Sequence, residues 1–478
     1  MNETTIRKKN LVISLVLSLL ILIFLKSEAV LLILPTFLSS FLLLEIISLG
    51  LQKGGSFFHP VIFSSIVILW SLVLSPVFCI FYESYLVLSP KDIDWNYWLS
   101  ILSWFYMGCV IVYYLLAKLF LIKRDIKDRR FFDKKRVVTI GLIFLSVSLI
   151  CQILVYLKFG GIIGYMVSWT ESRDQFDGLG LLFMFSEPFP IIALILFCLL
   201  VDPNKVRSPL LIIVLLFIVF FVLKLLFGGF RGSRSNTIWG LFWFAGIVHL
   251  YFFRLKAAHF LVGLTFLILF MNLYSLYKSF GIDAFTFQYS LEDTGRFEDN
   301  PTLTILLNDF SRAGLHAFML SQYFDYGFYE IKFGQTYLYT IGKLIPFFNP
   351  DFLYSKNSAG SEILYDRQSN LIYKDYYNTR IYGAYGEGFL NFGPFFAVFI
   401  FGLVSLFIIY LDNFCRSLNK FDPTYLVIPF LSNLSIILLI ADSDNMIFFL
   451  LKNSFLVFLF IITLYYFAMR KRKVLKSV

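Results

Sequence analysis

The 478-residue chain has little charge, because only 15% of its residues are Asp, Glu, Lys or Arg. A soluble globular protein carries roughly a quarter of such residues. Histidine occurs four times and cysteine five times, and the widely spaced cysteines form no CxxC pair. The sequence therefore predicts neither a disulfide framework nor a zinc motif. The shortage of charge argues against an ordinary soluble domain.

Hydrophobic residues, by contrast, make up 59% of the chain and gather in long apolar runs. Runs of about 18 or more apolar residues are typical of membrane-spanning helices. A membrane β-barrel would show short segments of alternating polarity instead. The predicted fold class is therefore an all-α polytopic membrane protein.

Apolar runs and polar breaks divide the chain into twelve predicted spans. They are residues 11–25, 29–51, 61–81, 97–122, 137–157, 181–201, 209–227, 236–253, 257–280, 386–411, 424–441 and 447–469. The basic connection "KRDIKDRRFFDKKR" and the basic tail "RKRKVLK" predict which side is cytoplasmic. Cytoplasmic loops also account for the net charge of +10, so nucleic acid is not an expected partner.

This topology places one long polar segment on the outer face and divides the chain into three parts. Residues 1–280 form a bundle of nine spans, residues 281–385 form an extracytoplasmic loop, and residues 386–478 add three spans. The loop holds 13 of the 28 tyrosines. Disordered segments are poor in aromatic residues, so we expect the loop to fold into short helices.

The short outer connection "GGFRGSRSNT" (228–237) carries Arg231 and Arg234 between two apolar spans. The two arginines could simply anchor the chain to lipid phosphates. However, the positive-inside bias does not explain arginines on the outer face. Flexible glycines, forked guanidiniums and a helix start capped by Ser235 or Asn236 together describe a phosphate-binding corner.

The long loop and its exit supply four further candidates. Arg312 and His316 are spaced i, i+4, so they share one face of a helix, where a near-neutral imidazole can act as a base. The alternative is that His316 has only a structural role. Arg380 and Glu387 lie near the outer mouth of the next span. Glu387 either pairs with an arginine or acts as a base.

Metal-binding and nucleotide-binding motifs are missing from the sequence. It contains no HxxxH, P-loop or GxSxG pattern, and the acidic stretch "TESRDQFDG" (170–178) is interrupted by an arginine. We therefore expect no metal site and no cofactor.

The late region of the chain resembles a known family. The segments "FGQTYLYTIGKLIP" and "YGEGFLNFGPFFAVFIFGL", together with the outer RGSR turn and a large late loop holding Arg and His, are similar to the Wzy-type polymerases of bacterial O-antigen and capsular polysaccharides. The resemblance covers roughly residues 228–411. The earlier spans match only in being hydrophobic.

The resemblance implies a metal-independent membrane glycosyltransferase with a GT-C-like architecture in the bacterial cytoplasmic membrane. Its active site would face outward and would transfer a glycan from undecaprenyl pyrophosphate to another lipid-linked repeat unit. Arg231 and Arg234 would hold the pyrophosphate, Arg312 or Arg380 would complete the cradle, and His316 would orient or deprotonate the acceptor. Membrane lipids and a chain-length-determining co-polymerase are the other implied partners.

Two alternatives stay open at this point. An O-antigen ligase-like transferase would use the same donor site with a different acceptor. A transporter or flippase of lipid-linked sugars would instead line a central cavity with charge and show matching halves.

Overall fold

In a computed structural model of the protein, the regular secondary structure of the described residues is helical, apart from a two-residue antiparallel pairing of β1 (Phe131–Phe132) with β2 (Met469–Arg470). The structure describes residues 3–25, 30–85, 93–123, 131–171, 176, 178–201, 208–231, 234–280, 306–307, 310–327, 329–345, 352–365, 381–419 and 423–470.

Within these ranges, eight helical segments are long and apolar enough to cross a membrane. They are Leu31–Gln52, Pro60–Phe81, Trp95–Phe120, Lys134–Lys158, Gly180–Leu200, Pro209–Leu226, Gly383–Ser417 and Pro423–Ile440. The bent pair Ser443–Leu451 and Phe455–Ala468 adds a ninth if it counts as one span. The chain is therefore a helical polytopic membrane protein, as predicted, whereas the predicted number of twelve spans is not confirmed.

Three of the twelve predicted spans are helical but do not meet these criteria. They correspond to α1 (Glu3–Leu25), to α11 (Arg234–Ile247) with the π-helical turn that follows it, and to α12 (Ala257–Phe280). In α12 the apolar helix found among the described residues is Ala258–Tyr274. A crossing helix needs about 20 mainly apolar residues, and the structure describes each of these helices only in part, so whether they cross a membrane stays a prediction.

The chain forms two compact units, and each combines segments that are far apart in the sequence. The first unit comprises Met1–Arg124, Leu303–Arg416 and Leu434–Ile447. Its helices are α1, α2 (Val30–Gln52), α3 (Pro60–Ile68), α4 (Ser75–Phe81), α5 (Trp95–Phe120), α14 (Ala313–Ser321), α15 (Gln335–Gly342), α16 (Lys356–Tyr365) and most of α17 (Gly383–Ser417). The short helices α14, α15 and α16 lie in the segment predicted as the outer loop, whose position outside the membrane stays a prediction.

The second unit comprises Asp125–Thr302, Ser417–Asn433 and Phe448–Val478. Its helices are α6 (Lys134–Lys158), α7 (Ile162–Glu171), α8 (Gly180–Ser186), α9 (Phe189–Leu200), α10 (Pro209–Leu226), α11, α12 and α20 (Phe455–Thr463). Helix α18 (Ile428–Ile440) contributes residues to both units, and α19 (Ser443–Phe448) belongs almost wholly to the first.

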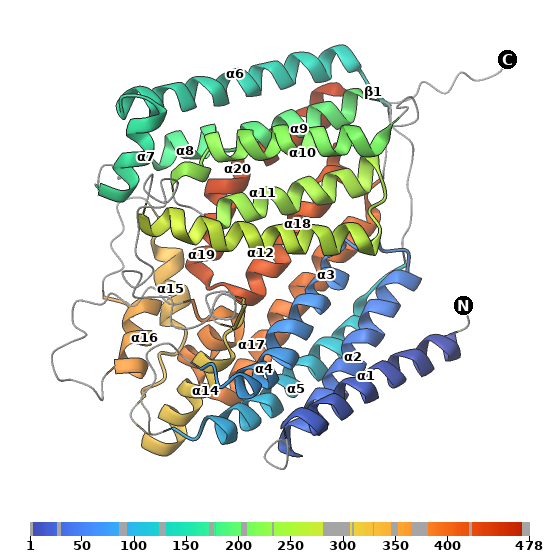
Figure 1. The fold of residues 1–478 in the computed structure, drawn as a ribbon, viewed down its shortest axis with the longest axis vertical. Coiled ribbons are helices and arrows are strands. Elements are labelled where there is room, and N and C mark those ends of the chain that lie inside the picture. Colours follow the sequence, from blue (N-terminus) through green and yellow to red (C-terminus); the bar gives the residue numbers. More distant parts are fainter. Residues whose placement is uncertain are drawn as a thin grey trace. The chain divides into compact units, whose positions relative to one another are not determined.

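In the first unit, α2 packs along α5, α1 packs along α2, and α14 packs on α5 and α4 (Figure 1). Buried aromatic and aliphatic side chains of α5, α14 and α17 form its main core. This arrangement brings an early span, a loop helix and a late span together around one set of side chains.

Two of the helices in this unit are broken at prolines, for a clear physical reason. A π-helical turn (Leu69–Leu74) joins α3 to α4 just before Pro76, which has no N–H for the regular helical ladder. In α17 the backbone leaves the helical region at Gly393, with φ 81° and ψ 172°, directly before Pro394. Proline disfavours helical geometry in the preceding residue, and only glycine takes this positive φ without strain.

The far end of α17 is held by a buried ion pair. Arg416 Nε donates to Asp412 Oδ2, and both side chains are fully buried. The guanidinium also donates to the carbonyls of Lys53 (2.8 Å) and Gly50 (3.2 Å), while Asp412 Oδ1 accepts from Val61 N (3.0 Å). The pair therefore ties the connection between α2 and α3 to α17.

Arg416→Ala should lower the free energy of unfolding by about 3–5 kcal/mol, because it leaves the Asp412 carboxylate buried with one donor. Denaturation of the purified protein in detergent measures this loss. Arg7→Ala, which removes an exposed arginine of α1, is the matched control and should change stability by less than about 0.5 kcal/mol. Equal effects of the two variants would contradict a structural role for the pair.

Candidate functional site

The start of α14 places two of the predicted site residues at one cavity. Ser311 caps the helix, because its hydroxyl accepts from Ala313 N (3.1 Å) and also bonds the Ser75 hydroxyl of α4. Arg312 is the residue before the first helical turn, and its carbonyl accepts from His316 N (2.8 Å). The predicted i, i+4 pair therefore exists, and both side chains line the same hollow.

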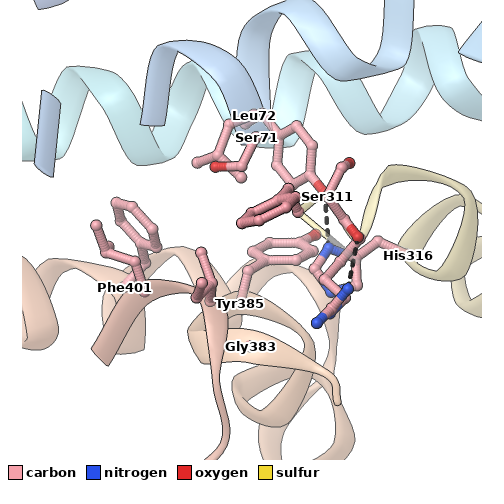
Figure 2. Close-up of a pocket in the computed structure, with 12 residues that line it drawn as sticks. Ser71, Leu72, Ser311, His316, Gly383, Tyr385 and Phe401 are labelled. Atoms are coloured by element: carbon pink, nitrogen blue, oxygen red, sulfur yellow. Dashed lines mark hydrogen bonds between the residues drawn. The ribbon is translucent and has the colours of Figure 1, made fainter. Parts of the chain in front are cut away.

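The cavity lies wholly within the first unit. Figure 2 shows His316 of α14 and Tyr385 of α17 at the cavity, with Ser71 and Leu72 of the π-helical turn on its other side. It offers about 20 Å³ to the centre of a water molecule, which suits one or two waters and is too little for a sugar ring. The described cavity can therefore hold the proton-transfer part of a site but not a whole glycan.

Hydrogen bonds determine which nitrogen of His316 carries the proton. Nε2 lies 2.7 Å from the carbonyl oxygen of Tyr382, which can only accept, so Nε2 is the protonated nitrogen. Nδ1 is then unprotonated and accepts from the hydroxyl of Tyr106 of α5, at 2.6 Å. The imidazole is thus neutral, and its basic nitrogen faces a tyrosine hydroxyl.

The pKa of His316 agrees with this arrangement. Burial chiefly lowers this pKa, the bond to the Tyr382 carbonyl raises it and the nearby Arg312 lowers it, and together they bring it to about 4. The ring is only 3% exposed. At neutral pH the His316 ring is therefore uncharged, with its proton on Nε2 and with Nδ1 as the basic nitrogen.

Glu387 has different partners from those expected. Its buried carboxylate accepts from Thr336 Oγ1 (2.9 Å), Ser443 Oγ (2.6 Å) and Ser443 N (2.7 Å). No ion pair joins Glu387 to Arg312, and the side chains of the other three candidate arginines lie outside the described residues, so the predicted pairing with an arginine stays a prediction. A catalytic role for Glu387 is not tested, but these contacts are those of a residue that joins α15, α17 and α19.

A second carboxylate at this end of α17 was not anticipated from the sequence. Asp442 Oδ1 accepts from Tyr382 N (2.6 Å) and Gly383 N (2.8 Å), and Oδ2 lies 2.5 Å from Lys356 Nζ. Burial alone would lower the pKa of Lys356, but the carboxylates of Asp442 and Asp444 outweigh it and raise that pKa. A charged Lys356 therefore pairs with the Asp442 carboxylate, which in turn accepts hydrogen bonds from the first amides of α17.

The RGSR turn lies in the second unit. Arg231 ends a short 3-10 turn and Arg234 begins α11, and the structure describes their backbone but not their side chains. The carbonyls of Gly229 and Phe230 accept from the hydroxyls of Tyr274 and (at 2.8 Å) Tyr277 of α12. Buried tyrosines therefore hold the turn in place.

Two expectations for this turn are wrong. Asn236 does not cap α11, because the helix already begins at Arg234 and the Asn236 amide donates to Glu187 Oε2 (2.6 Å). Gly228 was expected to let the backbone approach a ligand, but protein atoms occupy the space beside its Cα. With φ 118°, its Cβ position would lie 2.6 Å from Asn236 Nδ2.

Several residues predicted for the site are not brought together by the described structure. Arg380 lies outside the described residues, and Arg231 and Arg234 belong to the other unit from His316. A shared pyrophosphate cradle therefore stays a prediction. In the part of the chain that the structure describes, no group of three or more His, Cys, Asp and Glu is arranged to hold a metal ion.

Comparison of the chain with protein-family models, curated proteins and solved structures finds no match. The site must therefore be interpreted from its own geometry.

The pKa of His316 leads to a prediction about pH. Because the pKa is about 4 in the folded protein and 6.5 in the unfolded chain, the unfolded state binds more protons between these values. The stabilisation from the neutral ring is fully present above pH 6.5 and is lost as the pH falls towards 4, by about 3 kcal/mol. Unfolding free energies in detergent, measured from neutral pH down to about pH 4.5, should therefore fall less steeply in His316→Gln than in the wild type.

His259→Gln provides the matched control and should retain the wild-type slope, since this histidine lies outside the cavity. Identical slopes for the wild type and His316→Gln would show that the ring is not held neutral by the fold.

Proposed function

We propose that the protein polymerises lipid-linked oligosaccharide repeat units at the outer face of a bacterial cytoplasmic membrane. It would transfer a glycan from undecaprenyl pyrophosphate to a sugar hydroxyl of another lipid-linked repeat unit. The observation that supports this proposal is the buried, neutral His316 bonded to Tyr106 and sharing a cavity with Arg312, in a helical membrane protein. The twelve-span topology with an outward site belongs to the same proposal.

In the proposed reaction, the acceptor hydroxyl oxygen attacks the anomeric carbon of the donor, and the bond from that carbon to the pyrophosphate oxygen breaks. The acceptor proton passes to the Tyr106 oxygen while the Tyr106 proton passes to His316 Nδ1. Undecaprenyl pyrophosphate leaves with the bonding electrons. A weak base is sufficient here, because the leaving group is already good and bond breaking leads.

The arginines are assigned to the negative charge that develops on the leaving group. Stabilising such charge is often the largest contribution to catalysis, and guanidiniums can bind phosphate oxygens in pairs. Arg312 is partly exposed beside the cavity, so it is the described residue best placed for this role. Arg231, Arg234 and Arg380 are proposed to complete the cradle, in line with the resemblance noted above.

Incubating the purified protein with a synthetic lipid-linked repeat unit, in buffer containing EDTA, tests the proposal. Gel separation of the products should show a ladder of chain lengths. A ladder without added metal supports a metal-independent polymerase, whereas unchanged substrate under conditions that keep the protein folded contradicts it. Deleting the gene separates the ligase alternative, since loss of a polymerase leaves single repeat units on the final acceptor and loss of a ligase leaves none.

Tyr106 and His316 should act as one unit in this assay. We expect Tyr106→Phe and His316→Gln each to lower kcat by roughly 100- to 10,000-fold, because each interrupts the same proton path. The kcat of the double variant should be no lower than that of the less active single variant, because the effects of groups that act together are not additive. Multiplication of the two losses would mean that the residues act independently.

Cys109→Ala is the matched control for Tyr106→Phe, because Cys109 is equally buried in α5 but does not line the cavity. It should leave kcat within a few-fold of the wild type. Replacing Arg231 or Arg234 by Ala should abolish chain extension while the protein remains in the membrane.

A further inference from the structure

Helix α15 carries apolar side chains on its outward side. Leu338 and Ile341 of α15, three residues apart on one helix face, and Ile345, just beyond the helix, are each more than half exposed, and the neighbouring Phe333 and Phe352 are 77% and 73% exposed. We call these five residues the α15 apolar face. An exposed apolar patch of this kind usually marks a site that contacts a membrane, a ligand or another protein.

The opposite side of α15 is polar and buried. Thr336 Oγ1 donates to Glu387 and accepts from Asn391 Nδ2 (2.7 Å), while Thr340 Oγ1 lies 3.0 Å from Ser443 Oγ. The helix therefore turns its polar side to the protein and its apolar side outward. This is the reverse of a helix on a water-soluble protein, and it is the arrangement expected next to hydrocarbon.

The contacts of α15 also locate it along α17. Its leading segment is bonded to α17, because Lys332 N donates to Leu390 O (3.2 Å) and Phe333 N donates to Asn391 O (2.9 Å). Just beyond this point, exposed apolar side chains follow one face of α17 from Phe395 to Phe414. At 1.5 Å per residue this stripe is about 29 Å long, which matches a hydrocarbon core of about 30 Å.

The α15 segment is thus attached to α17 at the Gly383 end of this exposed apolar stripe. We propose that α15 is an interfacial helix whose apolar face is embedded in the lipid acyl chains of the adjoining leaflet. Lys343, exposed at the end of the helix, would extend to the lipid phosphates while its stem covers apolar surface. The occupant is bilayer lipid, and the inference does not depend on the proposed function.

This position has a consequence for the cavity. The buried side of α15 forms hydrogen bonds with Ser443 and Glu387. The adjacent Asp442 accepts from Tyr382 N, and the Tyr382 carbonyl accepts from His316 Nε2. Lipid contact at α15 therefore supports, through hydrogen bonds, the element that orients the imidazole.

Spin labelling of the full-length protein in lipid nanodiscs tests the proposal. Nitroxide labels at Leu338→Cys and Ile341→Cys are compared for collision with oxygen, which concentrates in lipid, and with a water-soluble nickel chelate. Phe399→Cys on the α17 stripe is the lipid-exposed control, and Ser358→Cys, exposed on α16, is the control outside the α15 apolar face. The unsubstituted protein corrects for labelling of the five native cysteines.

We expect the ratio of oxygen to nickel collisions at Leu338 and Ile341 to match that at Phe399 and to exceed that at Ser358 several-fold. A ratio equal to that at Ser358 would place the face in water and overturn the proposal. Protection from both reagents would mean that protein covers the face, which also overturns it. Because both positions are exposed, labelling them should leave the fold intact, and a single sharp elution peak confirms this before measurement.

Discussion

The arrangement of the candidate site depends on the carboxylate of Asp442, which bonds Lys356 and the start of α17. It is fully buried, so its charge must be compensated within the protein. Lys356 supplies the opposite charge, and Tyr382 N and Gly383 N, the amides at the start of α17, supply the remaining donors. These amides carry the positive end of the helix dipole, so the carboxylate and the helix start stabilise each other.

The position of the candidate base follows from this interaction. With its amide held by Asp442, Tyr382 presents its carbonyl to His316 Nε2, which leaves Nδ1 for Tyr106. A few residues along α17, Glu387 repeats the principle by accepting three hydrogen bonds from Thr336 and Ser443. Polar groups thus gather inside this end of the unit while apolar groups face outward, which is the arrangement that a lipid environment favours.

The membrane fold was predictable because apolar length alone identifies a spanning helix. Eight of the predicted spans meet that criterion in the described residues, and a ninth does so as a bent pair. The number twelve is not confirmed, because α1, α11 and α12 are helical but are described only in part. Residues 61–81 were predicted as one span, and the π-helical turn before Pro76 that brings Ser71 to the cavity was not predicted.

For the site, the sequence by itself determined that Arg312 and His316 lie together, since spacing along one helix is a local property. It also determined the helical membrane class, which depends on the composition of each segment alone. Only the tertiary structure decided that Tyr106, 210 residues before His316, bonds its ring, and that Glu387 accepts from the hydroxyls of Thr336 and Ser443. These partners come from different helices, and packing between helices depends on side-chain contacts that no spacing along the chain records.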